Sequence, residues 1–463
     1  MSFASRPQQA SSGTSTPFRQ NPFDTPPPLS SVPTQDNRDG SGYFPSVKTM
    51  HVPRRRKFVS ARLRKGEYDE KPWLTGAKDP NFKRKRWEKV IFWSSIGLGV
   101  LIGGAICAFA YISVSTGTFC PIWEDEFGSI DADSWSFEIQ RGGFGTGAFD
   151  WTTDDPTNAY TDAEGLHIVP TLTTETTDIT PEQIYDGYEL NLTTAKTCTT
   201  TDHKMCSILS DKKTGDIVNP VRSARMTTKG KKSIRYGKVE VVAKMPKGDW
   251  LWPAIWMMPE EEVYGSWPMS GEIDIAESRG NNPDTYPDGR NSIISALHWG
   301  PSTGTDAFWR TSGKHNLRRT DYSKNFHTYG LEWTKDYLFM YIDNQLLQVF
   351  FIKFAVGPRT MWNRGKFGEF QLDNKSALFD PWSHTGMRNT PFDQKFYLIL
   401  NVAVGGTNGF FKDGVGNKPW GDGSRTGPKE FWDARRLWLP TWGEEAERGM
   451  TVKSVKMYSE GGC

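Results

Sequence analysis

Residues 270–278 read SGEIDIAES, which places three carboxylates in six residues of an otherwise apolar stretch. The segment EIDI alternates with the period of a pleated strand, so Glu272 and Asp274 share one face and the two isoleucines share the other. Glu277 has the wrong parity for the face of Glu272. One extra residue, a β-bulge around Ala276, would return Glu277 to that face and bring the two glutamates near each other.

Paired carboxylates of this kind predict a specific chemistry. Two carboxyl groups held about 5–5.5 Å apart in a sugar-sized cleft are what a retaining glycosidase uses, one as nucleophile and one as acid and then base. The alternative is that the charges form the solvated face of an exposed edge strand. A bare ExDxxE motif does not separate these two interpretations, so the surrounding sequence must decide.

Several further blocks accompany the motif. The motif region reads WPMSGEIDIAESRGN, and YGKVEVVAKMPKGDWLWPAIWMMP lies upstream at residues 236–259. Downstream follow ALHWGP, FHTYGLEWT, LNVAVGG, FFKDGVGNKPW and FWDARRLWLPTW. From about Trp123 to Tyr458 these blocks resemble, in the same order, the laminarinase-like branch of glycoside hydrolase family 16. The resemblance implies an all-β domain, a two-sheet β-jelly-roll sandwich of the concanavalin A-like kind, which cleaves β-1,3-glucans with retention.

The resemblance also implies roles for the carboxylates. Glu272 is expected to be the nucleophile, Glu277 the acid/base and Asp274 the residue that orients Glu272. A related invertebrate group binds β-glucan as recognition proteins and often lacks the catalytic glutamates, whereas this chain keeps both. An endo-acting β-1,3-glucan hydrolase is therefore the leading expectation. A cell-wall glucan transglycosylase is the second, and a non-catalytic glucan receptor is the third. β-Glucan is the expected partner in each case.

Tryptophans near the motif are candidates for sugar stacking. Trp250, Trp252 and Trp256 share one parity in the strand-like WLWPAIWMM, which predicts a row of rings on one face. Burial in the core is the alternative for any one of these rings. By resemblance, Trp252, Trp256 and Trp267 match aromatic positions that line the glucan cleft of the family.

Three polar residues complete the predicted substrate site. His298 in ISALHWG matches a family histidine close to the catalytic carboxylates, where it would hydrogen-bond the substrate or tune a glutamate. Asn158 in TNAY and Asn401 in LNVAVGG are candidates for recognition of sugar hydroxyls. Their alternative is a structural role in turns or strand ends.

The N-terminal part predicts a membrane anchor. Residues 1–89 hold a Ser- and Pro-rich segment with few apolar groups, which predicts a disordered tail, followed by a basic segment. Residues 90–114, Val90 to Val114, form a run of 25 residues without a charge, long enough to cross a bilayer as a helix. The glycoside hydrolase domain is expected at residues 115–463.

Charges around the run predict its orientation. Basic runs, RRRK at residues 54–57 and KRKR at 83–86, precede it, and acidic PIWEDEFGSIDADS follows. The positive-inside rule predicts a single-pass type II protein with a cytosolic tail and a lumenal or extracellular catalytic domain. The basic runs then contact anionic lipid, so no nucleic-acid partner is expected. Gly99 and Gly103 form a GxxxG motif that could favour a weak helix dimer. The arrangement resembles that of fungal membrane proteins of this family implicated in β-glucan assembly.

The chain contains five cysteines. Cys107 lies in the predicted span, and the other four lie on the predicted outer side, where an oxidising compartment favours disulfides. Four cysteines allow three pairings. We expect Cys198 to pair with Cys206, closing a short loop, and Cys120 with Cys463, tying the first and last strands. Free thiols are the alternative.

Further signals concern glycans and metals. Asn191 in NLT and Asn374 in NKS are candidate glycan acceptors, consistent with the outer location. The sequence has no HExxH, no paired CxxC and no dense His cluster, so no catalytic metal and no cofactor are expected. Many family relatives bind a structural calcium through an acidic residue of the closing strand. Lys453 stands at that position here, which disfavours calcium.

Overall fold

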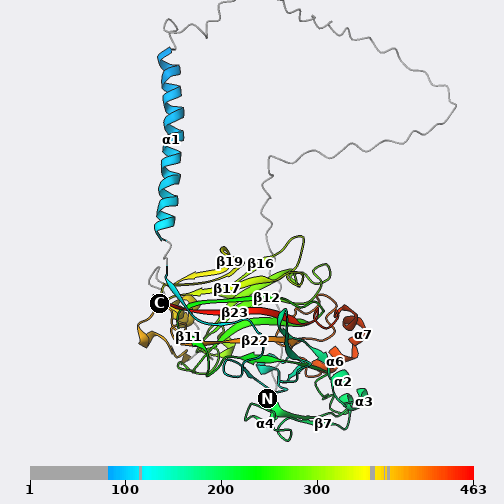
Figure 1. Ribbon diagram of the computed structural model, residues 1–463. Helices are drawn as coiled ribbons and strands as arrows, with labels where there is room; N and C mark the ends of the chain where they lie inside the picture. The colour runs from blue at the N-terminus through cyan, green and yellow to red at the C-terminus, as the bar shows by residue number, and fades with distance from the viewer. Residues whose placement is uncertain (1–81, 114–116, 355–359, 370, 373–375) are drawn as a thin grey trace, which may run out of the picture. The chain divides into compact units, whose positions relative to one another are not determined.

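In a computed structural model of the protein, the described residues are 82–113, 117–354, 360–369, 371–372 and 376–463 (Figure 1). The chain forms two units, residues 1–103 and residues 104–463. The predicted tail before residue 82 and the sequon residue Asn374 lie outside the described residues.

The first described element is the helix α1, Phe82–Ser113. Its segment Lys83–Ala110 is long and apolar enough to cross a membrane, judged by length and composition alone. The helix begins before the predicted span at Val90 because the basic segment consists of good helix formers, and Arg84 pairs with Glu88 one turn later at 3.4 Å. One such helix is weak evidence of a membrane span, so the anchor, its orientation and its dimerisation stay predictions.

Two eight-stranded antiparallel sheets form the main body of the second unit (Figure 1). The strands of the first, here called the β23 sheet, are β1 (Phe119–Asp125), β4 (Ala159–Asp162), β5 (Gly165–Ile168), β12 (Gly237–Lys244), β17 (His327–Trp333), β18 (Tyr337–Ile342), β19 (Asn344–Lys353) and β23 (Met450–Glu460). Their order is β19-β18-β17-β12-β23-β5-β4, and β1 pairs with β23.

The second sheet, here called the β14 sheet, carries the acidic motif. Its strands are β2 (Ser136–Phe137), β10 (Arg225–Thr227), β11 (Ser233–Ile234), β13 (Leu251–Pro259), β14 (Glu272–Glu277), β15 (Ser292–His298), β16 (Ser312–Asn316) and β22 (Phe396–Val404). Their order is β16-β15-β14-β13-β22-β10-β2, and β11 pairs with β22. The motif strand β14 thus has a hydrogen-bonded neighbour on each side.

Shorter elements flank the sheets. The strands are β3 (Asp150–Thr152), β6 (Thr171–Leu172), β7 (Glu189–Asn191), β8 (Ser207–Leu209), β9 (Val221–Ser223), β20 (Gln371–Leu372) and β21 (Ser376–Ala377). The helices are α2 (Thr173–Thr176), α3 (Pro181–Tyr185), α4 (His203–Cys206), α5 (Met361–Gly365), α6 (Gly427–Asp433) and α7 (Arg435–Trp438). Single 3-10 turns occur at Gly143–Gly145, Thr303–Thr305, Phe308–Arg310, Phe367–Glu369, Ser383–Thr385 and Leu439–Thr441.

The two sheets share one hydrophobic core. Along β12, buried and half-buried residues alternate, so Val239 and Val241 point into the core. Ile273 of β14 and Leu398 and Leu400 of β22 are fully buried in the same cluster. Two antiparallel sheets facing each other across an apolar layer are a β-sandwich. The predicted all-β jelly-roll fold is therefore confirmed.

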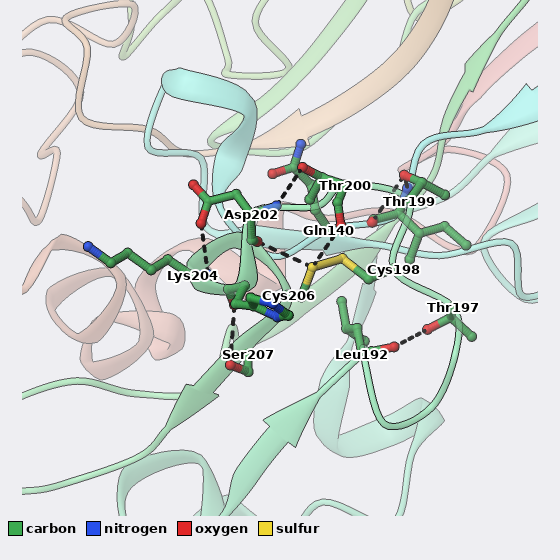
Figure 2. The surroundings of a disulfide bond; sticks show 12 residues. Gln140, Leu192, Thr197, Cys198, Thr199, Thr200, Asp202, Lys204, Cys206 and Ser207 are labelled. Atoms are coloured by element: carbon green, nitrogen blue, oxygen red, sulfur yellow. Dashed lines mark hydrogen bonds between the residues drawn. A yellow bond between two sulfur atoms is a disulfide. The ribbon is translucent and has the colours of Figure 1, made fainter.

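Both predicted disulfides are present. Cys120 of β1 is bonded to Cys463, which follows β23, the strand that pairs with β1. Cys198 is bonded to Cys206, the last residue of α4. Figure 2 shows that Asp202 caps this helix, because its carboxylate accepts the backbone N–H of Lys204 at 3.0 Å. The short loop is thereby held both covalently and by its cap.

Candidate functional site

The acidic strand β14 carries the predicted bulge. The step from Asp274 to Glu277 on β14 matches the shorter step from Ala296 to Ile294 on β15, so β14 contains one extra residue. The register against β13 shifts at the same place. The extra residue returns Glu277 to the face of the other two acidic side chains. We call Glu272, Asp274 and Glu277 the carboxylate cluster.

Each of the two glutamates accepts an indole N–H. Nε1 of Trp267 donates to Oε2 of Glu272 at 2.8 Å. Nε1 of Trp252 donates to Oε1 of Glu277, also at 2.8 Å. These bonds leave the second oxygen of each carboxylate for another partner. The two acids are therefore separately oriented, as a nucleophile and an acid/base require.

His298 links the cluster to a further carboxylate. It lies opposite Glu272 in the β14–β15 register, with Nε2 3.2 Å from Asp274 Oδ2 and 4.0 Å from Glu272 Oε1. Its other nitrogen, Nδ1, lies 2.5 Å from Oδ2 of Asp306. Burial disfavours the charged imidazolium, but the carboxylates of Asp274 and Glu272 outweigh this effect and raise the pKa of His298 well above its usual range.

Asp274 and Glu277 of the carboxylate cluster are held toward their neutral forms. Burial and the nearby carboxylate of Glu272 raise the pKa of Asp274 well above its usual range. Burial also raises the pKa of Glu277, although His298 and the N–H of Trp252 oppose that rise. A glutamate that keeps its proton can protonate a leaving group, so the chemistry of Glu277 suits a general acid.

Asp274 is buried next to His298. It is 3% exposed, and its Oδ2 is buried without a well-aligned hydrogen bond, although the His298 nitrogen lies nearby. Its recorded side-chain contact is with His298. The prediction that Asp274 orients Glu272 stays a prediction. His298 Nε2 lies near both carboxylates, 3.2 Å from Asp274 Oδ2 and 4.0 Å from Glu272 Oε1.

Of the three rings matched to the glucan cleft of the family, Trp252 is the most enclosed. It is 8% exposed, and Phe410 stacks on it at 3.9 Å between ring centroids with an interplanar angle of 7°. A covered ring cannot offer that face to a pyranose. Trp267 is half-buried beside Glu272, and its ring centroid lies 5.9 Å from that of His298. Trp267 thus lies beside the carboxylate cluster.

Trp256 and Asn401 form a pair on neighbouring strands. Nε1 of Trp256 donates to Oδ1 of Asn401 at 2.7 Å, and both residues are half-buried. The guanidinium of Arg225 lies 4.6 Å from the centre of the Trp256 ring. Binding of a sugar by Trp256 and Asn401 stays a prediction, and Arg225 lies over the ring without having been predicted there.

Two expectations are corrected. Trp250 is 2% exposed and packs edge-on against Trp420 and Phe411 in the core, so the predicted row of three cleft rings does not exist. Asn158 is fully buried, and its amide donates to Val169 O at 2.8 Å and Thr171 Oγ1 at 2.9 Å. Its hydrogen bonds hold strands together, so it is not available to a sugar hydroxyl.

The sequence analysis missed several residues at the site. Asp306 has no motif of its own, and its role depends on a turn that returns it to His298. Phe308 stacks on the His298 ring at 5.0 Å and is 44% exposed, and the adjacent Trp309 is 60% exposed. The sequence does contain a signal for Arg279. It lies two residues after Glu277, so strand periodicity places both side chains on the same face.

The cluster also has the spacing of a metal site. One ligand atom each from Glu272, Asp274 and His298 lie within 4.8 Å of one another. A cation there would compete with the proton of His298, because the same carboxylates stabilise both charges. The residues have the donor types and spacing to hold a divalent ion.

Known proteins share sequence similarity with this chain. The family model described as glycosyl hydrolases family 16 matches residues 179–356. A β-1,3-glucan-binding protein of Penaeus monodon is 42% identical over 326 residues, covering 70% of this chain and 84% of that protein. A glucan endo-1,3-β-glucosidase of Cryptopygus antarcticus is 32% identical over 306 residues, covering 65% of this chain and 84% of that protein. The solved laminarinase catalytic domain of Thermotoga maritima matches with 23% identity and a TM-score of 0.44, covering 74% of this chain and 99% of that one.

Proposed function

This chain belongs to glycosyl hydrolase family 16, and from that premise we propose that it is a retaining, endo-acting hydrolase of β-1,3-linked glucan. The observation that carries the proposal is the bulged strand, on which Glu272 and Glu277 share a face and each accepts an indole N–H at 2.8 Å. A protein that only binds glucan has no need of two separately oriented acids on one face of a strand.

The proposed mechanism is a double displacement. Glu272, as the carboxylate, attacks the anomeric carbon and forms a glycosyl-enzyme bond while Glu277 donates its proton to the leaving oxygen. Glu277, now ionised, takes a proton from the incoming acceptor, whose oxygen then displaces Glu272. The proton of His298 stabilises the negative charge of the cluster throughout, and Asp306 holds the histidine ring in place.

The printed names of the relatives support glucan as the ligand but divide on turnover. The Penaeus monodon relative is named for β-1,3-glucan binding, and the Cryptopygus antarcticus relative for endo-1,3-β-glucosidase activity. We favour turnover because both glutamates are present and oriented. A second candidate is a glucan transglycosylase, since the same residues serve when the acceptor is a sugar hydroxyl in place of water.

Product analysis on laminarin, with chain lengths resolved, separates the three activities. A hydrolase gives only products shorter than the substrate. A transglycosylase also gives products that are longer. Glucan binding without any product from any β-glucan would overturn the proposal and favour a receptor.

We also propose that the protein is a type II membrane protein whose catalytic domain faces the lumen or the cell exterior. Support comes from the apolar helix α1, the basic residues before it and the two disulfides after it. Protease added to sealed vesicles or intact cells should reach the region after Thr116 and spare the tail before Arg86. Cleavage of an N-terminal tag from outside would contradict this topology.

A further inference from the structure

The loop that follows β22 covers one of the two tryptophans that hydrogen-bond the carboxylate cluster. Residues 405–426 connect β22 to α6, and Phe410 of this loop stacks on Trp252 at 3.9 Å with nearly parallel rings. The same Trp252 donates its indole N–H to Glu277. A rotation of the indole would break that bond, so the ring that packs on Trp252 also controls the orientation of the proposed acid/base.

Arg279 fixes Phe410 from the other side. The centre of its guanidinium lies 4.1 Å from the Phe410 ring centre, and its Nε and Nη2 both donate to the carbonyl oxygen of Phe410, at 3.1 and 2.7 Å. Arg279 is 7% exposed, and it leaves β14 two residues after Glu277. The strand that carries the acid/base thus also carries the side chain that holds the stack in place.

A buried lysine anchors the same loop. The side chain of Lys418 is fully buried, and its Nζ donates to the carbonyl of Phe411 and to Asp413, both at 2.7 Å, and to Asp422. The ammonium group therefore ties three points of the loop together, as a bound cation would. It thereby restrains Phe411, the residue that follows Phe410.

We propose that Phe410 and Arg279 are positioning residues for Glu277, because they clamp the indole of Trp252 so that its N–H stays on the acid/base carboxyl group. This inference rests on the proposed function. It gives Trp252 the role of holding the acid in place, in contrast to the sugar platform predicted from the sequence. Loss of the clamp should impair protonation of the leaving group while sparing the attack by Glu272.

The kinetic test uses two substrates that differ in their need for acid. Full-length Phe410→Ala is compared with Phe410→Tyr, which keeps a ring, and with Phe351→Ala, which removes an exposed ring from β19 of the other sheet. On laminari-oligosaccharides we expect kcat of Phe410→Ala to fall roughly tenfold or more with KM little changed. On a dinitrophenyl laminaribioside, whose leaving group needs no proton, kcat/KM reports only the formation of the glycosyl-enzyme and should fall by less than about threefold, compared with roughly tenfold or more for kcat/KM on the oligosaccharides. Phe410→Tyr should restore most of the loss, and Phe351→Ala should match the wild type.

Equal losses on both substrates would overturn the inference, because they would show that Phe410 acts through stability or substrate binding. A second readout does not need turnover. In a full-length chain with ¹⁵N-labelled tryptophan, the Trp252 indole N–H, assigned by Trp252→Phe, should exchange with solvent roughly tenfold faster in Phe410→Ala than in the wild type. Unchanged exchange would refute the clamp even if the wild type proved inactive, whereas an inactive wild type with faster exchange would refute only the proposed function.

Discussion

Each sheet of the sandwich carries buried or half-buried carboxylates, and the two sets differ in their hydrogen-bond donors. One is Glu240 on the β23 sheet, and the other is the carboxylate cluster on the β14 sheet. On β12 of the β23 sheet, Glu240 accepts hydrogen bonds from Tyr341 at 2.6 Å, Lys238 at 3.1 Å and Tyr458 at 3.2 Å. On the β14 sheet, Asp274 has a buried oxygen without a well-aligned partner. Both are acidic residues on strands of alternating pattern, so residue type and periodicity alone do not distinguish them.

The difference appears in their acidity. Burial opposes the charge of Glu240, but the hydroxyl of Tyr341 and the ammonium of Lys238 outweigh it and lower its pKa. Burial and the charge of Glu272 together raise the pKa of Asp274. Donors thus outweigh burial at Glu240, whereas at Asp274 burial and the like charge of Glu272 outweigh the opposing effect of His298. A destabilised, oriented group of acids indicates catalysis, whereas a satisfied one indicates structure.

The largest expected effect concerns turnover. Glu272→Gln and Glu277→Gln should each lower kcat by roughly a thousandfold or more, because the nucleophile and the acid act in the transition state, while glucan affinity changes little. Glu240→Gln is the matched control on the other sheet and should leave kcat within about twofold. Rates on laminarin and binding titrations on the same variants measure both. Wild-type turnover in either site variant would erase the contrast between the two groups.

Trp267→Phe tests whether orientation of the nucleophile matters. It removes the N–H that bonds Glu272 and keeps an aromatic ring, so we expect kcat to fall roughly ten- to a hundredfold with intact folding. The corresponding change on the other sheet, Tyr341→Phe, removes a donor from Glu240 and should leave kcat unaltered. Equal kcat values for Trp267→Phe and the wild type would mean that the indole bond is incidental.

Stability should change in opposite directions for the two groups. Asp274 has a raised folded-state pKa, so its contribution is complete below its unfolded pKa and is lost as the pH rises through the folded value. Asp274→Asn should therefore remove the part of the stability that the wild type loses as the pH rises, and should lower activity. The same loss of stability between acid and neutral pH in the wild type and in Asp274→Asn would contradict the account.

Glu240 has a lowered folded-state pKa, so its contribution is present above its unfolded pKa and is lost as the pH falls through the folded value. Glu240→Gln should destabilise the fold at neutral pH by about 1–2 kcal/mol, and the difference from the wild type should shrink in acid. Urea unfolding at several pH values measures both variants. A Glu240→Gln variant as stable as the wild type at pH 7 would show that the hydrogen bonds of Glu240 do not stabilise the fold.

The smallest effect is expected at the edge of the carboxylate cluster. Trp256→Phe loses the hydrogen bond to Asn401 but keeps most of the ring, so affinity for laminari-oligosaccharides should fall by a few-fold, with the melting temperature nearly unchanged. Isothermal titration and a thermal melt on one sample suffice. A large loss of stability with unchanged affinity would place Trp256 with the structural residues of the sheet.

Local pattern predicted much of the fold and the acidic centre. The bulge in β14, both disulfides and the proximity of His298 to the acids follow from parity, spacing and resemblance. The prediction of a row of tryptophan rings is wrong because Trp250 has a positive φ of 68°. This conformation ends the extended backbone before Leu251 and turns the Trp250 ring into the core. Parity counts only within a continuous strand.

Long-range packing accounts for the other failures. Asn158 bonds residues that follow it on other short strands, and Phe410 reaches Trp252 from a loop far along the chain. No local pattern encodes such contacts, because they depend on which segments the sandwich brings together. Asp306 belongs to the same class, since it reaches His298 only through the turn between β15 and β16.

The central claim is that Glu272 and Glu277 perform a double displacement, and the anomeric configuration of the first product tests it most directly. Proton NMR of laminarin digestion, followed from the first minute, should show the β-anomer of the new reducing end appearing first and the α-anomer only later by mutarotation. The same time course with Glu272→Gln should show neither. Initial release of the α-anomer, or undiminished release of either anomer by Glu272→Gln, would contradict the account.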